Sequence, residues 1–113
     1  MFIFENLEAY KKAMNFAKNI YGLRNQIKDR TIKDQLLRAT LSIPLNIAEG
    51  QGRIHKKEKR QFYQTARASL FECLPIIQVC LEIKIIDQHQ YENLYLLMDE
   101  VGRMISGLIN SLD

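Results

Sequence analysis

The sequence of 113 residues has no tryptophan, only two prolines and only five glycines. The scarcity of glycine and proline argues against a disordered or loop-rich chain, since such chains are rich in these two residues. Its two cysteines, Cys73 and Cys80, have no CxxC spacing and are too few for a disulfide-stapled secreted domain. We therefore expect reduced, buried thiols in a cytoplasmic protein. HxxxH, ExxH and CxxC patterns are also missing, so we expect no metal site.

Long hydrophobic runs are missing too. No apolar stretch approaches the roughly 18 residues that cross a bilayer. The opening "MFIFENLEAY" has no basic segment and reaches an acidic residue at Glu5, unlike a signal peptide. We therefore expect no membrane contact and a single domain over residues 1–113, a length that suits one hydrophobic core.

No stretch alternates apolar and polar residues as a strand does, and helical spacing dominates. It predicts helices over about residues 7–27, 32–49, 56–85 and 91–112. In the third helix a 4,3 spacing predicts a packed seam of Phe62, Ala66, Ser69, Cys73, Ile76, Cys80 and Ile83. Thr31 is the expected N-cap of the second helix, and Gly50 its expected left-handed C-cap. Short links between long helices predict an all-α, antiparallel up-down four-helix bundle.

Apolar residues are more abundant in the first two helices than one buried face requires. The second helix carries two apolar stripes side by side, of which the core of a monomer needs only one and leaves the other as surplus surface. They consist of Leu36, Thr40, Ile43 and Ile47, and of Leu37, Leu41, Leu45 and Ala48. A monomer would expose this surface as a large patch. We therefore expect a homo-oligomer.

The second helix also contains a proline and a polar column. Pro44 has no amide hydrogen and is expected to kink the helix. The column consists of Arg38, Ser42, Asn46 and Glu49, and the third helix offers Arg67, Ser69 and Glu72 as partners. We interpret Arg38, Ser42, Asn46, Glu49, Ser69 and Glu72 as a structural polar network that fixes the register of the helices, in preference to a catalytic group.

Basic residues concentrate where the third helix begins. They are Arg53, His55, Lys56, Lys57, Lys59 and Arg60. Lys56 and Lys57 fall in the first helical turn, where the helix dipole disfavours cations by about 0.3–1 kcal/mol. This segment predicts a site for polyanions, with a solvated helix face as the alternative. Further basic residues are candidates to extend this polyanion site: Lys11, Lys12, Lys18, Arg24, Lys28, Arg30 and Lys33.

Charge is divided unevenly along the chain. Residues 1–67 carry a balance of +8 and residues 68–113 a balance of −5, which together give the net charge of +3. Such asymmetry indicates either a polyanion-binding face or self-complementary assembly. The side chain of Tyr63, three residues after Arg60, is placed either to stack on a nucleic-acid base or to pack in the core. We favour packing in the core.

The stretch "RATLSIPLNIAEGQGR", followed by "FYQTARASLFE", resembles the four-helix-bundle family encoded in intervening sequences of bacterial 23S ribosomal RNA genes. The first helix, "FENLEAYKKAMNFAKNIY", is also similar to that family's. Two positions depart from the pattern: His55 replaces the usual Ser or Thr that opens the third helix, and Pro75 predicts a second kink.

The resemblance implies a ring-shaped homopentamer. It also implies kinship with the accessory protein of diversity-generating retroelements, a basic pentamer thought to bind nucleic acid and a reverse transcriptase. A reverse transcriptase is thus a partner suggested by family analogy.

Together these observations predict a non-enzymatic homopentamer that binds RNA, or DNA, through backbone and shape. No cofactor or catalytic residue is expected, since neither His55 nor His89 lies beside a nucleophile in a known motif. The alternative is an oligomeric protein-binding scaffold that docks its partner through Phe2, Ile3 and Phe4, with no nucleic-acid contact.

Overall fold

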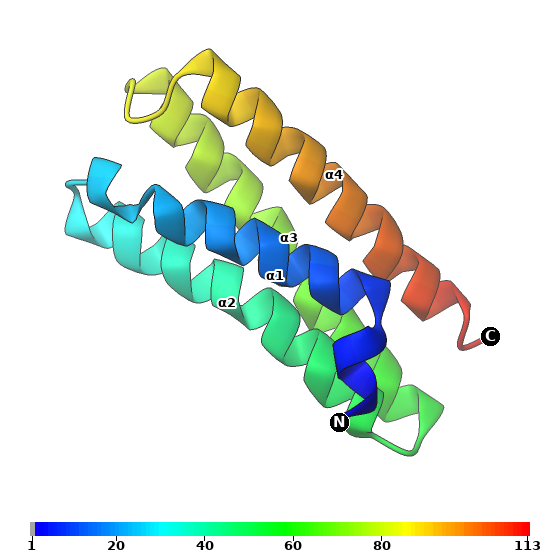
Figure 1. Ribbon diagram of the computed structural model, residues 1–113. Helices are drawn as coiled ribbons and strands as arrows, with labels where there is room; N and C mark the ends of the chain where they lie inside the picture. The colour runs from blue at the N-terminus through cyan, green and yellow to red at the C-terminus, as the bar shows by residue number, and fades with distance from the viewer. Residues whose placement is uncertain (1) are drawn as a thin grey trace.

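The structure, a computed structural model, describes residues 2–113. All regular structure in this part of the chain is helical. The elements are η1 (Ile3–Asn6), α1 (Glu8–Gly22), η2 (Arg24–Gln26), α2 (Arg30–Gly52), α3 (Lys56–Glu82) and α4 (Gln88–Asn110). Figure 1 shows the four α-helices side by side, with consecutive helices running in opposite directions. The predicted all-α bundle of four helices is therefore confirmed for the described residues.

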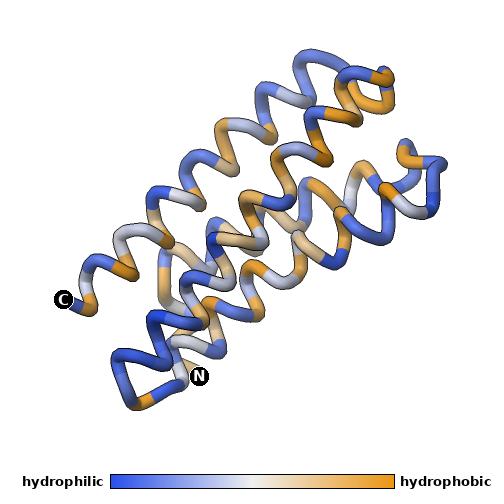
Figure 2. The backbone as a smooth tube through the Cα atoms, turned by 180° about the vertical axis from the view of Figure 1, so that it is seen from behind, coloured by the Kyte–Doolittle hydropathy of each residue, from blue (hydrophilic) through white to orange (hydrophobic). Residues whose placement is uncertain are grey.

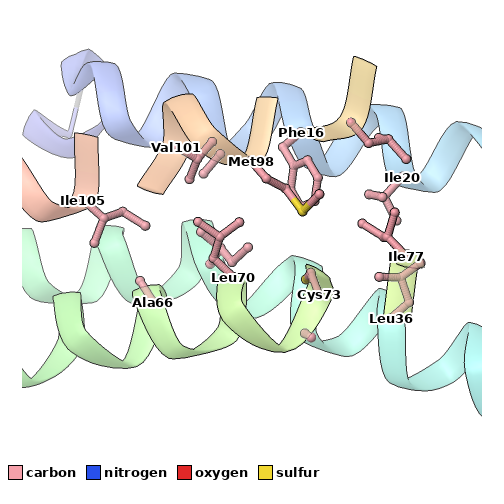
Figure 3. Packing of buried hydrophobic residues seen from close by; sticks show 14 of the residues in the cluster. Phe16, Ile20, Leu36, Ala66, Leu70, Cys73, Ile77, Met98, Val101 and Ile105 are labelled. Atoms are coloured by element: carbon pink, nitrogen blue, oxygen red, sulfur yellow. The ribbon is translucent and has the colours of Figure 1, made fainter. Parts of the chain in front are cut away.

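The core is built from one apolar stripe of each helix. Each α-helix packs on its two neighbours in the order α1, α2, α3, α4, and α4 returns to α1. Figure 3 shows Phe16 and Ile20 of α1 meeting Leu36, Cys73 and Met98 of the other three helices. All of these side chains are buried. Because every helix contributes to a common interior, burial of apolar area is the main stabilising term.

The stripe of α3 that faces the core differs in phase from the one expected. The heptad pattern suggested Phe62, Ala66, Ser69, Cys73, Ile76, Cys80 and Ile83. The buried set is Tyr63, Ala66, Leu70, Cys73, Ile77 and Cys80. The two sets share three positions, so spacing alone could not choose between them. The structure buries the apolar side chain of Leu70 in place of Ser69, which lies beside α2 instead.

Two expected helix caps are wrong. The N-cap of α2 is Asp29, whose carboxylate accepts a hydrogen bond from the Ile32 amide at 3.0 Å, so Thr31 lies inside the first turn. Gly50 is not a left-handed C-cap, because α2 continues to Gly52 and none of the glycines described has positive φ. Instead Gly50 is buried in the helix.

The other helices also differ in their bounds from those expected, and α4 begins at Gln88 rather than near residue 91. The helix expected over residues 7–27 is divided into α1 and η2, and α3 ends at Glu82 rather than near residue 85. Lys84 ends α3 in the left-handed region, at φ 64°. There the amide of Ile85 donates to the Cys80 carbonyl at 2.8 Å, as in a Schellman motif. Both α2 and α3 continue as α-helix through Pro44 and Pro75, and the kinks stay predictions.

The apolar surplus expected on α2 is present on the surface. Leu45 is 60% exposed and Leu41 is also exposed, whereas Ile43 and Ile47 are fully buried. A single chain therefore leaves the second stripe of α2 only partly covered, as the sequence predicts for a protomer that has a further contact to make.

Candidate nucleic-acid interface

The basic segment lies at the turn where α2 passes into α3. Gly50 makes this turn tight: a Cβ atom at this position would lie 2.7 Å from Cε1 and 2.9 Å from Cδ1 of Tyr63. The absence of a side chain lets the end of α2 approach α3 closely. Tyr63 fills the space and its hydroxyl donates to the side chain of Gln51 at 3.2 Å. Residues 53–55 then connect the two helices.

Lys59 serves the end of α2. Its ammonium donates to the carbonyl oxygen of Gln51 at 2.9 Å and to that of Gly50 at 3.3 Å. These carbonyls belong to the last turn of α2, where helical partners are missing and the dipole favours a cation. Lys59 therefore links α3 to the end of α2.

Arg53 and Arg60 are engaged as well. Arg53 pairs with Glu49, lies 4.0 Å from Glu58, and places its guanidinium 4.9 Å from the centre of the Phe62 ring. Arg60 pairs with Asp113 and so fastens the C-terminal end of the chain to α3. These partners neutralise much of the charge of both arginines.

The remaining three basic residues project from the first turn of α3. His55, Lys56 and Lys57 are exposed, and within residues 2–113 none of them forms an ion pair. His55 occupies the N-cap position, but its side chain makes no capping hydrogen bond. Figure 2 shows this corner of the bundle coloured as hydrophilic. Of the six predicted residues, Arg53, Lys59 and Arg60 therefore contact other parts of the chain. The side chains of His55, Lys56 and Lys57 are exposed and open to a ligand.

A further exposed residue lies among the open basic residues. Ile54 is 88% exposed at the tip of the turn, between Arg53 and His55. Sequence patterning does not single it out, because one isoleucine in a link belongs to no apolar stripe. Its place within the basic segment is the signal that could have found it.

The other cations do not extend this surface. Arg24, Lys28, Arg30 and Lys33 surround the connection from α1 to α2, which lies at the opposite end of the bundle (Figure 1). Since α2 spans 23 residues, that connection is about 35 Å away. The expectation that these four join the segment is therefore wrong.

Lysines of α1 are partly neutralised by acidic residues. Lys12 lies 2.7 Å from Glu100 of α4, and the hydrogen bond and charge of that carboxylate raise the pKa of Lys12. Lys11 lies 3.5 Å from Glu8. Lys18 is exposed, two turns further along α1. Tyr63 is buried in the core, where desolvation raises its pKa, so it does not stack on a ligand.

The polar column forms a network that is smaller than expected. Ser42 and Ser69 join α2 to α3 by a hydrogen bond of 2.9 Å, and Asn46 donates to the hydroxyl of Ser42 at 2.9 Å. Arg38 and Glu72 pair across the same two helices at 3.0 Å.

One expected member of the network and one possible partner lie elsewhere. Glu49 pairs with Arg53 instead of reaching α3, and Arg67 faces α4, where it donates to Ser106 at 3.4 Å. The other five expected residues form a hydrogen-bonded group of Ser42, Asn46 and Ser69 and an ion pair of Arg38 with Glu72.

The described residues give little support for a metal site, a reactive thiol or a membrane span. No group of three or more His, Cys, Asp or Glu side chains within residues 2–113 is arranged to hold a metal ion. Both cysteines are buried, and desolvation raises the pKa of Cys73 to about 11. Over the same residues, every helix is too short or too polar for a membrane span.

Comparison with known proteins gives one family. Its model, described as the 23S rRNA-intervening sequence protein, matches residues 5–107. A crystal structure from Bacteroides thetaiotaomicron, of a protein with unknown function from the S23 ribosomal protein family, has the same fold with a TM-score of 0.85. The match covers 89% of this chain and 97% of that chain at 21% sequence identity. No curated protein matches the chain.

Proposed function

Because the chain belongs to the family of 23S rRNA-intervening sequence proteins, we propose that it is a non-enzymatic, cytoplasmic nucleic-acid-binding module. Its ligand is RNA in the first place, contacted through phosphates rather than base edges. The contacting residues are His55, Lys56 and Lys57, with Arg53, Lys59 and Arg60 shaping the turn that presents them.

One observation carries the proposal: Lys56 and Lys57, in the first turn of α3, form no ion pair with any residue from 2 to 113. The helix dipole makes cations unfavourable there, by about 0.3–1 kcal/mol each. Glu58 in the same turn lies near Arg53 instead of pairing with either of them. A bound phosphate would offset this cost, since it attracts both ammonium groups and the free amides at the start of α3.

Assembly would strengthen such a weak contact. The family resemblance implies a homopentamer, and the exposed second stripe of α2 supports a contact between copies. Five copies of the turn on one face would make many weak phosphate contacts at once, which raises avidity without any new contact. The absence of a built recognition element in this turn supports readout of backbone and shape.

Binding rather than catalysis fits the titratable groups of the site. His55 has no acidic side chain paired with it in residues 2–113, and the thiols of Cys73 and Cys80 are buried in the core. A nucleophile needs a neighbouring base or a lowered pKa, whereas burial raises the pKa of both thiols.

The test is a titration of a labelled RNA hairpin and a matched DNA duplex at several salt concentrations. Wild-type affinity should fall steeply with salt, because bound lysines release counterions from phosphates. The double variant Lys56→Glu/Lys57→Glu should lose binding while keeping its helicity and its oligomeric mass.

A matched control uses the same charge reversal at the other end of the bundle. Lys28→Glu/Lys33→Glu changes the net charge equally and should retain most of the affinity. Absence of binding by the wild type at low salt would overturn the proposal and leave the protein-binding scaffold. Equal loss in both double variants would show that net charge, and not this turn, governs binding.

A further inference from the structure

A groove runs between α3 and α4 on the face away from α1 and α2. Its volume is about 460 Å³, within the range of sites that hold ligands or partner side chains. Leu70, Phe71 and Leu74 line it from α3, and Tyr95 and Met98 from α4. Phe71 is 65% exposed, so a large apolar surface stands open to solvent.

The end of the groove nearer the C-terminus is polar and cationic. Arg67 and Ser106 line it, together with Asn110 in the last turn of α4. Arg67 is half-buried, and within residues 2–113 it forms no ion pair; its partner is the Ser106 hydroxyl at 3.4 Å. A carboxylate placed here would meet an arginine that has no charged partner of its own.

The N-terminal arm, residues 2–5, has the complementary composition. Phe2 and Ile3 are 70% and 73% exposed, although both are large and apolar. The next side chain, Phe4, is anchored against Tyr10, with ring centres 5.0 Å apart. Glu5 adds an exposed carboxylate after the apolar side chains, and one of its oxygens accepts a hydrogen bond from the Phe2 amide at 3.2 Å. The arm thus offers two apolar side chains followed by an acid.

The arm and the groove lie on opposite faces of the bundle. The element η1, which contains most of the arm, packs on α1 and α2, whereas the groove lies between α3 and α4. One chain therefore cannot fill its own groove. A neighbouring copy placed side by side can. Such a contact joins two different faces of identical chains, and a heterologous contact of this kind forms a ring when its rotation closes.

The arm and the polar part of the groove lie towards the same end of the bundle. The arm precedes α1, and α4 runs opposite to α1 (Figure 1), so α1 begins at the end of the bundle where α4 ends. Ser106 and Asn110, which line the polar part of the groove, belong to the last turns of α4. Rotation about an axis parallel to the bundle keeps both at this end from copy to copy.

We infer that the N-terminal arm of one copy docks in the α3–α4 groove of the next. Phe2 and Ile3 cover the apolar stretch beside Phe71 and Tyr95, and Glu5 pairs with Arg67. The occupant of the groove is therefore a second copy of this chain. This inference rests on the self-assembly in the proposed function and adds the faces that meet, independently of any nucleic-acid ligand.

The first test measures oligomeric mass by light scattering on two variants that block either side of the contact. Ile3→Asp places a charge on the arm. Gly107→Leu adds an apolar side chain in the groove at a position where nothing lies within 4 Å of the added Cβ, and thermal unfolding checks that this variant folds. Both variants should fall to the 13.2 kDa protomer. The control Gly22→Leu, also at an open glycine but on α1, should keep the wild-type mass.

The second test mixes the two blocked variants. Ile3→Asp keeps an intact groove and Gly107→Leu keeps an intact arm, so the mixture should form a dimer that contains one copy of each. It cannot grow further, because the remaining arm and groove are both blocked. A mixture that stays at the protomer mass would overturn the head-to-tail contact.

The third test exchanges the charges of the ion pair. Glu5→Arg and Arg67→Glu should each weaken assembly about tenfold or more, and the double variant should restore it. Thermal unfolding at low concentration checks that Arg67→Glu still folds. Failure of the double variant to regain affinity would contradict the pairing of Glu5 with Arg67.

The outcomes separate the inference from the proposed function. Wild-type mass in Ile3→Asp and in Gly107→Leu would overturn the arm contact while leaving assembly and RNA binding intact. Loss of mass with captured RNA still bound at reduced avidity would support both. A wild-type protein that is monomeric at all concentrations would overturn this inference and the assembly on which it rests, but not the phosphate contacts of Lys56 and Lys57.

Discussion

The ammonium of Lys59 on α3 lies 2.9 Å from the carbonyl oxygen of Gln51, so that a cation of one helix caps the end of the helix before it. The same basic segment therefore contains a structural lysine and, two and three residues earlier, two open ones. Sequence composition treats the three alike. Their environments assign them different roles.

Replacing Lys59 should affect stability more than binding. In Lys59→Met the aliphatic stem remains but the hydrogen bonds to the end of α2 are lost, so we expect the free energy of unfolding to fall by about 1 kcal/mol. Lys57→Met should leave it unchanged within about 0.5 kcal/mol, because that side chain is exposed. Chemical denaturation measures both, and RNA titration should show the opposite order of effects. A stability loss confined to Lys57→Met would contradict this division.

Gly50 should tolerate no side chain. Gly50→Ala would place a Cβ atom 2.7 Å from the Tyr63 ring, and the strain should outweigh the better helix propensity of alanine. We expect a net destabilisation of about 1–2 kcal/mol by thermal or chemical unfolding. The control is Gly52→Ala in the same helix, where nothing lies within 4 Å of the added atom and the change should stay within about 0.5 kcal/mol. Equal effects at the two glycines would argue against the close approach.

The sequence indicated two neighbouring stripes on α2 because both follow the helical period, and the fold decides between them: Leu36, Thr40, Ile43 and Ile47 are all buried. The sequence failed at Gly50, since a glycine near a helix end suits a left-handed cap and a close helix contact equally well. Only the approach of Tyr63, 13 residues later, decides between them.

The candidate site shows the same limit. Its six basic residues are adjacent in the sequence and so were found together, but their engagement depends on distant partners. Arg60 pairs with Asp113, which lies 53 residues further along the chain and is brought near only by the fold of α4. The N-cap of α2 was missed for a local reason, because Asp29 and Thr31 are both good caps and the backbone path selects the aspartate.

Asn46 should contribute to stability through Ser42, not to ligand binding. Asn46→Ala removes donors to the hydroxyl and to the carbonyl oxygen of Ser42, at 2.9 and 2.8 Å. We expect the free energy of unfolding to fall by about 1 kcal/mol and the affinity for RNA to stay the same. Glu49→Gln is the comparison, because it weakens the pair with Arg53 but leaves the bond between Ser42 and Ser69 in place. Lost RNA binding in a stable, assembled Asn46→Ala protein would make the network functional.

Cys73 should make the protein less stable in mildly alkaline solution. Burial raises the pKa of its thiol to about 11, against an ordinary value of 9.0 in the unfolded chain. Between these values the unfolded chain releases a proton that the folded chain retains, so stability is complete below pH 9 and falls as pH rises towards 11. The expected loss by pH 10 is about 1 kcal/mol, since one pKa unit corresponds to about 1.4 kcal/mol.

Chemical denaturation of wild type and of Cys73→Ala between pH 8 and 10 measures this loss before most lysines and tyrosines titrate. Cys73→Ala lowers stability at every pH, because it removes a buried side chain that packs against Thr40. The stability of Cys73→Ala should nevertheless depend less on pH than that of the wild type. Burial raises the pKa of Cys80 less strongly, so Cys80→Ala should keep most of the wild-type dependence of stability on pH. Parallel pH profiles for wild type and Cys73→Ala would show that the thiol ionises equally in both states, and would contradict its burial behind α2.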